Sequence, residues 1–223
     1  MNFFSSSAAA LFEFLFPKAP SLHALENMSA GDLVVSLPSA EPIRDEHIIA
    51  VFSYAHPAVR EMIWELKYRG NRAVADTLAQ VLYDVLSHEL AERGAYENFR
   101  NPLLIPIPIS DKRRLERGYN QTEILGQAIA RLDHDRTLFE YDNQLLEKTT
   151  YTQSQARTHA TRRERAENLD HSMRVPDAFR HKIQGRNIIL LDDVTTSGAT
   201  FAEARRALKE AGARKILCLA AAH

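Results

Sequence analysis

Two adjacent carboxylates, Asp192 and Asp193, stand between an apolar run and a turn that is rich in hydroxyl groups. The run, Ile188–Leu191, is too short for an ordinary helix and predicts a strand covered on both faces. The turn reads Val-Thr-Thr-Ser-Gly-Ala-Thr, and from Ala199 the apolar residues recur with the period of a helix. A turn that opens a helix leaves backbone N–H groups unpaired at the positive end of the helix dipole, where a phosphate binds well.

The paired acids suit a ligand of a different kind. Carboxylates at this position can accept hydrogen bonds from two neighbouring hydroxyls of a sugar, or hold the water shell of Mg²⁺. Acids and turn together match the shape of a ribose 5-phosphate. The alternative is an ordinary helix start with acidic residues near its dipole, which would be preferred for the acids alone. The order of strand, acids, hydroxyl-rich turn and amphipathic helix favours the binding site.

A basic stretch follows a second predicted strand, Leu103–Ile107. Pro106 and Pro108 cannot donate to a ladder, so the strand is expected to end there and Ser110–Gln121 to form its exit loop. Between Asp111 and Arg117 the loop has four basic and two acidic residues, which suits a pyrophosphate or a second phosphate. A solvated charged loop is the alternative. A helix is expected next, with apolar residues on one face at Ile124, Leu125, Ala128 and Leu132.

The third polar stretch, Tyr151–Asn168, has almost no large aliphatic residue. It is either a surface loop or a mobile flap that brings positive charge over a polyphosphate and excludes water. A strand over 140–150 is expected to lead into it, and a strand near 172–175 to lead out. The last strand is predicted at 215–221, so residues 186–221 form a βαβ unit.

The remaining periodicity predicts two short strands and two helices. The strands are Leu33–Leu37 and Ile48–Tyr54. One helix lies between Pro57 and the stop at Gly70, and another runs from about residue 72 to 90. Lys67 and Arg69 close the first helix, where cations match the dipole.

Composition restricts the class of protein. The 223 residues carry a net charge of −1, so any recognition of an anion must be local. Cys218 is the single cysteine and is expected in a buried strand, and the nine histidines are scattered without ligand spacing. The apolar start contains Glu13 and no basic segment, so we expect a short amphipathic helix rather than a signal peptide, and a cytoplasmic protein.

The segment 188–200 resembles the signature of type I phosphoribosyltransferases that binds phosphoribosyl pyrophosphate (PRPP). Four pieces in order are similar to the ComF/GntX family of phosphoribosyltransferase-like proteins. They are Phe52-Ser-Tyr54 with Leu66-Lys-Tyr-Arg-Gly70, Ile105-Pro-Ile-Pro108 with Arg117-Gly-Tyr-Asn-Gln121, Gln155 with Arg165-Ala-Glu-Asn168, and Leu191–Thr200.

The resemblance implies an α/β fold, with a twisted and mostly parallel sheet flanked by helices. Residues 1–57 would form an N-terminal helix and hood, and residues 58–223 the phosphoribosyltransferase-like core. Family members usually open with a zinc-binding segment rich in cysteine. The region from Leu15 has none, so no zinc is expected.

The resemblance also implies roles for single residues. Asp192 and Asp193 would hold the ribose hydroxyls, with Mg²⁺ bridging ribose and pyrophosphate. The turn would take the 5′-phosphate through Thr195, Thr196, Ser197, Gly198, Ala199 and Thr200. Loop 110–118 would face pyrophosphate, and residues 147–168 would form the flexible catalytic loop. The cations expected near pyrophosphate or in that loop are Lys67, Lys112, Arg113, Arg117, Arg157 and Arg165.

Two functions follow from the resemblance. The first is an enzyme that transfers a phosphoribosyl group from PRPP and releases pyrophosphate. The second is a non-catalytic protein of DNA uptake in natural transformation, which binds single-stranded DNA and a helicase-like partner through its arginine-bearing loops. Neither function calls for a membrane partner.

Overall fold

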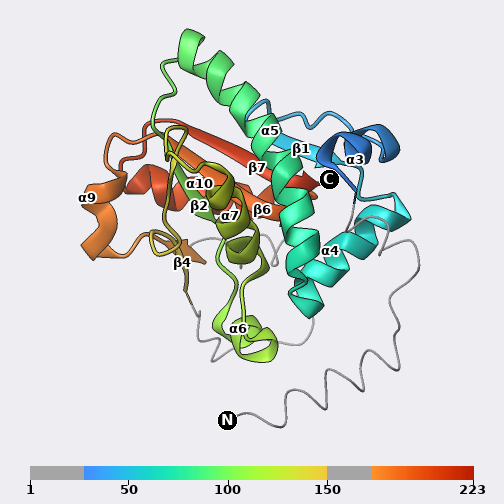
Figure 1. Ribbon diagram of the computed structural model, residues 1–223. Helices are drawn as coiled ribbons and strands as arrows, with labels where there is room; N and C mark the ends of the chain where they lie inside the picture. The colour runs from blue at the N-terminus through green and yellow to red at the C-terminus, as the bar shows by residue number, and fades with distance from the viewer. Residues whose placement is uncertain (1–27, 150–171) are drawn as a thin grey trace.

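A computed structural model describes residues 28–149 and 172–223 and shows a parallel sheet between two layers of helices (Figure 1). The main sheet has the strand order β1-β7-β6-β2-β3, and every pairing in it is parallel. Its strands are β1 Ile48–Phe52, β7 Ile216–Ala222, β6 Ile188–Val194, β2 Leu103–Pro106 and β3 Glu140–Tyr141. The predicted fold class, an α/β protein with a mostly parallel sheet, is confirmed.

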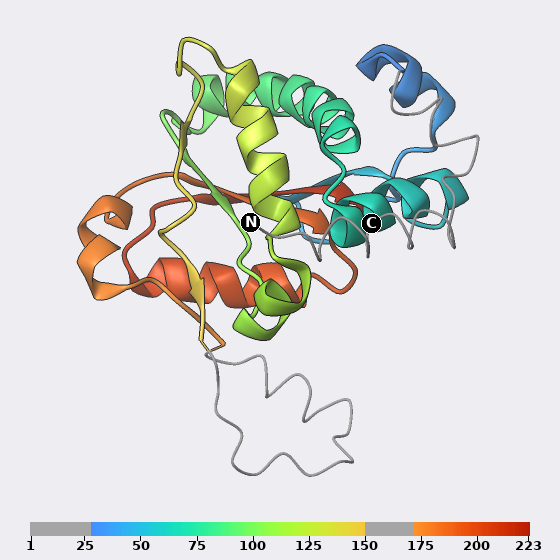
Figure 2. The ribbon, with the colours of Figure 1, turned by 60° about the horizontal axis from the view of Figure 1, so that its bottom comes forward.

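The two faces of the sheet are covered by different helices (Figure 2). Ile189 and Leu191 of β6 belong to a core shared with α4 Pro57–Arg69, α5 Arg72–Tyr96 and α7 Gln121–Leu132. Ile188 and Leu190 pack on the opposite side against α10 Ala199–Glu210. Because both faces are buried, β6 reads as a continuous apolar run, as the sequence predicts.

Most of the predicted elements are present. Helices α4, α7 and α10 and strands β1, β6 and β7 lie where the periodicity places them, and Cys218 is buried in β7. Helix α5 extends to Tyr96, beyond the predicted end near residue 90. Strand β2 ends at Pro106, although it is an interior strand between β6 and β3. A proline is tolerated there because the ladder continues from the next N–H, where Ile107 donates to Leu191 O at 2.8 Å.

Three sequence predictions are wrong. The predicted strand 33–37 is helix α3 Ala30–Ser36, which begins where Ser29 accepts a hydrogen bond from Asp32 N–H. The predicted exit loop 110–121 contains helix α6 Asp111–Arg117, which Ser110 caps and Gly118 ends with φ of 79°. The strand expected over 140–150 is two short strands: β3 in the main sheet and β4 Glu147–Lys148, which pairs antiparallel with β5 Met173–Arg174.

The chain also forms a 3-10 turn, Asp177–Phe179, and the short helix α9 Arg180–Ile183 before β6. Strand β1 lies before the predicted domain boundary at residue 57, so the predicted N-terminal segment supplies an edge strand of the main sheet. The hood stays a prediction. The expected starting helix, Arg157, Arg165 and most of the expected flexible loop lie outside the described residues. None of the helices in the described ranges has the length and apolar character needed to span a membrane.

Candidate functional site

The topology places a site where β2 and β6 end side by side. The chain leaves β2 toward α7 on one face of the sheet, and it leaves β6 toward α10 on the other face. In a parallel sheet, two neighbouring strands whose helices lie on opposite faces leave a crevice at their carboxyl ends, and ligands bind there. The predicted acids lie at the end of β6, and the predicted basic stretch follows the end of β2, so both border this crevice.

Asp192 and Asp193 are the fifth and sixth residues of β6, and both side chains are buried. Asp192 Oδ1 accepts a hydrogen bond of 2.8 Å from Asp193 N–H, and Asp193 Oδ1 accepts one of 2.8 Å from Val194 N–H. Asp193 also pairs with Lys67 of α4, whose Nζ lies 3.3 Å from Oδ1. The structure thus brings Lys67, for which the resemblance implied a place near pyrophosphate, into direct contact with one of the two acids.

The acids are not electrostatically equivalent. Burial raises the pKa of Asp192 well above its usual range, and the neighbouring charge of Asp193 raises it further, while Lys67 acts in the opposite direction. The second oxygen of Asp193, Oδ2, is buried without a hydrogen-bond partner among the described residues. A buried acceptor without a donor costs free energy, so this oxygen is suited to a ligand that brings a donor or a cation.

The predicted phosphate turn is open in part: Thr195 is buried and its N–H donates to Ala222 O at 3.0 Å, but the residues after it are more accessible. Thr196 and Ser197 are exposed, and Gly198, with φ of 73°, begins α10 without a side-chain cap. A Cβ on Gly198 would lie 3.3 Å from Ile48 Cδ1, so glycine also allows the close approach of β1. Ala199 N–H reaches Ser197 Oγ only at 3.4 Å. An uncapped helix start of this kind favours an anion.

Two of the motif pieces pack against each other beside the acids. The Tyr119 ring lies against Gly70 at the end of α4, and the Arg117 guanidinium lies 4.9 Å above the Tyr68 ring. Asn120 starts α7 by accepting from Thr122 N–H at 3.1 Å, and its amide donates to Ile107 O at 3.1 Å. These contacts hold the segment after β2 against the end of α4. They account for the glycine and aromatic residues in the motif pieces 66–70 and 117–121.

The predicted cations of α6 are placed differently from one another. Lys112 and Arg113 are exposed, and Lys112 faces Glu116 at 3.9 Å. Arg114 is paired with Glu123 of α7, and Arg117 donates to Gln121 Oε1 at 3.1 Å. Arg113 is therefore the α6 arginine best able to meet a ligand anion, whereas Arg114 and Arg117 hold α6 to its neighbours.

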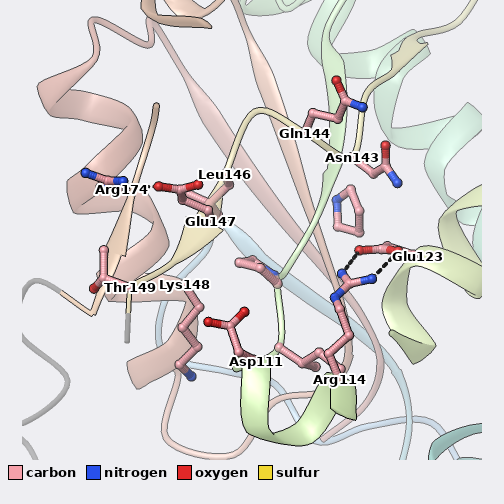
Figure 3. Close-up of a pocket in the computed structure, with 13 residues that line it drawn as sticks. Asp111, Arg114, Glu123, Asn143, Gln144, Leu146, Glu147, Lys148, Thr149 and Arg174 are labelled. Carbon is pink, nitrogen blue, oxygen red and sulfur yellow. Dashed lines mark hydrogen bonds and ion pairs between the residues drawn. The ribbon is translucent and has the colours of Figure 1, made fainter. Parts of the chain in front are cut away.

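Lys148 falls in the expected catalytic loop 147–168, but nothing in the sequence singled it out. It lies at the end of β4 and lines a cavity of about 600 Å³ between α6 and the β3–β4 segment (Figure 3). Burial lowers the pKa of Lys148 and the charge of Arg113 lowers it further, whereas Asp192 acts in the opposite direction. A lone lysine in a two-residue strand carries no periodic signal that would reveal this position. The lining of the cavity includes neither the acids nor the phosphate turn.

The acids fit Mg²⁺ by their chemistry. Mg²⁺ prefers carboxylate oxygens together with water and substrate phosphates, and Asp193 Oδ2 is a buried oxygen that still lacks a partner in the described part of the chain. In the same residues no three His, Cys, Asp or Glu side chains gather to hold a metal by themselves. Asp192 and Asp193 would therefore share a Mg²⁺ with a ligand rather than enclose it.

Comparison with known proteins agrees with the motifs, although no family model matches the chain. It is 29% identical over 171 residues to the DNA utilization protein YhgH of Escherichia coli O6:H1, covering 77% of this chain and 69% of that protein. It is 28% identical to competence protein F of Haemophilus influenzae, covering 79% and 72%, and 27% identical to competence protein ComFC of Bacillus subtilis, covering 76% and 62%.

Matching solved structures include a hypoxanthine phosphoribosyltransferase of Trypanosoma cruzi, at 12% identity and a TM-score of 0.39, covering 64% of this chain and 63% of that one. They also include an allosteric regulatory enzyme of purine biosynthesis, at 17% identity and a TM-score of 0.38, covering 71% and 30%. At these scores the structural matches add nothing to the assignment. The sequence relatives and the four motif pieces agree, and in both respects the chain is similar to proteins of the ComF family.

Proposed function

We propose that this protein binds PRPP, or a related phosphoribosyl compound, at the carboxyl ends of β2 and β6. The observation that carries the proposal is the adjacency of two features. Asp193 keeps a buried oxygen free of hydrogen-bond partners in the described structure, and the uncapped start of α10 follows five residues later along the chain. A sugar hydroxyl satisfies the first feature and a phosphate satisfies the second.

Each part of the ligand would be bound by a different group of residues. The 5′-phosphate would accept from N–H groups of residues 196–200 and from hydroxyls of the turn 195–200, and Asp192 and Asp193 would accept from the two ribose hydroxyls. Arg113 would face pyrophosphate together with Lys112, and Lys148, whose pKa responds to the charges of Arg113 and Asp192, would add a third cation. When bound, Mg²⁺ would neutralise pyrophosphate charge, with Asp192 and Asp193 as its protein neighbours.

The same arrangement supports phosphoribosyl transfer. Departure of pyrophosphate breaks the bond to C1 of the ribose and leaves positive charge on the sugar ring. A nitrogen acceptor then forms the new bond to C1 and loses its proton, which the released pyrophosphate can take up. Adjacent carboxylates below the ring would stabilise that charge, and cations of α6 would stabilise the leaving group. Transfer is the further step of the proposal, and binding is the part that the site geometry supports directly.

Calorimetric titration with Mg-PRPP tests the binding step. We expect the protein to bind and Asp192→Asn/Asp193→Asn to lose at least about tenfold in affinity, since two hydrogen-bonded charges are removed. Asp76→Asn is the matched control, because Asp76 forms an exposed ion pair with Arg131 away from the site. Equal affinity of the double variant and the unmodified protein would overturn the proposal.

A second candidate is DNA handling during natural transformation, favoured by the names of the relatives and by the exposed cations on α6. In this role the protein would bind single-stranded DNA and a helicase-like partner in the cytoplasm. Binding to a fluorescent oligonucleotide should then weaken steeply with salt. It should also weaken in Arg→Ala variants at 113, 114, 157 and 163, while Asp192→Asn/Asp193→Asn leaves it unchanged. Salt-independent binding would contradict this role.

A further inference from the structure

The ion pair between Lys67 and Asp193 occupies the position where a cation would meet the acids. Lys67 Nζ lies 3.3 Å from Asp193 Oδ1, and the side chains are 24% and 3% exposed. Asp192 lies beside this pair and accepts the N–H of Asp193. One protein ammonium therefore pairs with the second of two adjacent carboxylates, while Asp193 Oδ2 has no hydrogen-bond partner among the described residues.

Lys67 is held in place by its surroundings. It lies near the end of α4, where Gly70 packs under the Tyr119 ring and Arg117 covers Tyr68. Asn71, which caps the start of α5, donates through its amide to the buried Glu65 of α4 at 3.1 Å. With α4 fixed at this end, the ammonium can leave Asp193 only by a rotation of its own side chain.

A free divalent cation at Asp193 Oδ2 and Lys67 at Asp193 Oδ1 would be two positive charges on the same carboxylate. Without Lys67 the two acids would be a compact pair of carboxylates, which hard cations such as Mg²⁺ and Mn²⁺ favour. With Lys67 in place, a metal ion approaching Asp193 meets a positive charge a few ångströms away, in surroundings where charges are poorly screened. A ligand that brings its own negative charge removes this repulsion.

We propose that Lys67 is an internal counter-ion that keeps free divalent metal out of the empty site, so that metal enters only together with an anionic ligand. The inference rests on the proposed function for the identity of that ligand, but its central claim concerns the ligand-free protein. In this role Lys67 does not react with the ligand, but it determines whether metal binds alone or together with an anion. An ion pair that served stability alone would not affect how the protein binds metal.

The test is Mn²⁺ binding without any phosphoribosyl compound, followed by electron paramagnetic resonance of the free ion. We expect weak binding by the unmodified protein and at least about tenfold tighter binding by Lys67→Met, because one repelling charge is removed. Lys67→Arg keeps the charge and should bind as weakly as the unmodified protein. Lys182→Met is the matched control, since it breaks a 3.1 Å ion pair with Asp142 elsewhere.

The double variant Lys67→Met/Asp193→Asn tests whether the additional Mn²⁺ binding of Lys67→Met takes place at Asp193. The double variant should bind Mn²⁺ as weakly as the unmodified protein. The proposal would be overturned if the double variant still bound Mn²⁺ more tightly, or if Lys67→Met and the unmodified protein had equal Mn²⁺ affinities. Circular dichroism of each variant establishes that it is folded. The result is separable from PRPP binding: if PRPP fails to bind while Lys67→Met gains Mn²⁺, the proposed function fails and the counter-ion role stands.

Discussion

The ring of Tyr119 lies directly over the backbone of Gly70: a Cβ built on Gly70 would stand 3.0 Å from Tyr119 Cζ. Gly70 ends α4 and Tyr119 precedes α7, so the contact joins two segments that are about fifty residues apart in the sequence. Burial raises the pKa of the Tyr119 hydroxyl. Through this contact, the exit of β2 and the helix that carries Lys67 are held as one unit.

Replacing Gly70 should therefore cost more than backbone strain. Gly70→Ala places an L-residue at φ of 58° and pushes a methyl group into the Tyr119 ring. We expect roughly 1–2 kcal/mol from the left-handed backbone and about 1–3 kcal/mol from overpacking. Gly118→Ala is the matched control, because φ is 79° there and nothing lies within 4 Å of the new Cβ. Urea unfolding measures both, and equal losses would show that the ring contact contributes nothing.

Asp192→Asn should stabilise the protein at neutral pH while it weakens ligand binding. Burial raises the pKa of Asp192 in the folded protein, so the native state binds the proton more tightly than the unfolded chain does. The free energy of unfolding then falls as pH rises above 3.8, the ordinary value for Asp, toward the raised pKa. Asparagine has no charge to bury and keeps the acceptor for Asp193 N–H.

We expect a gain of about 0.5–2 kcal/mol at pH 7, in the range of substitutions that relieve a functional site. The gain should disappear as pH falls below the ordinary Asp value, where both proteins are uncharged at this position. Chemical denaturation between pH 3.5 and 8 measures the difference. A variant that is less stable than the unmodified protein at pH 7 would show that the ionised carboxylate is already compensated.

An element of the fold could be predicted from the sequence where the residues that determine it are close together in the chain. The strand, acids, turn and helix at 188–210 are contiguous, so period and residue type were sufficient to predict them. Helix α3 was missed because Leu33-Val-Val reads as a strand, whereas the cap at Ser29 decides the local structure and leaves Val34 and Val35 exposed. Helix α6 was missed because it buries no residue and so has no apolar period.

Parts of the site depend on contacts that the sequence does not display. From the residues around it, Lys67 suggested only a dipole match at the end of α4, and the resemblance implied a place near pyrophosphate. Nothing in the local sequence indicates that Asp193, more than a hundred residues away, is its partner. Glu203 of α10 is a second example, because a glutamate in an amphipathic helix ordinarily lies on the solvent face. It is buried, because it accepts from Met173 N–H across the interface with β5. The ion pair of Lys67 and the burial of Glu203 both depend on tertiary contacts, which the local sequence does not encode.

Arg113→Ala should raise the pKa of Lys148. Burial is the main cause of the lowered pKa of Lys148, and the positive charge of Arg113 is the next largest, so removing that charge makes protonation easier. Lysine side-chain NMR, with ¹³C labels at Cε, would follow the titration. Lys112→Ala is the control, because Lys112 is exposed and faces Glu116. A Lys148 pKa that is the same in Arg113→Ala and the unmodified protein would place Arg113 too far away to act on it.

Glu203→Gln should loosen the ribbon of β4 and β5, from which Lys148 projects. Glu203 is buried on α10, accepts from Met173 N–H at 2.9 Å and holds Arg206 through both carboxylate oxygens. Arg206 in turn donates to Met173 O at 2.8 Å, and the pairing raises its pKa. Glutamine keeps one acceptor but loses the charge, so we expect a loss of about 1–3 kcal/mol.

Hydrogen exchange separates a local effect from a global one. The Met173 amide should exchange faster in Glu203→Gln, while amides of β6 and β7 change only with global stability. Glu210→Gln is the matched control: it removes a 2.7 Å ion pair from the same Arg206, but its own side chain is more than half exposed. If both variants protect Met173 equally, the buried carboxylate does not anchor β5, and the position of Lys148 must depend on the cavity side of the ribbon instead.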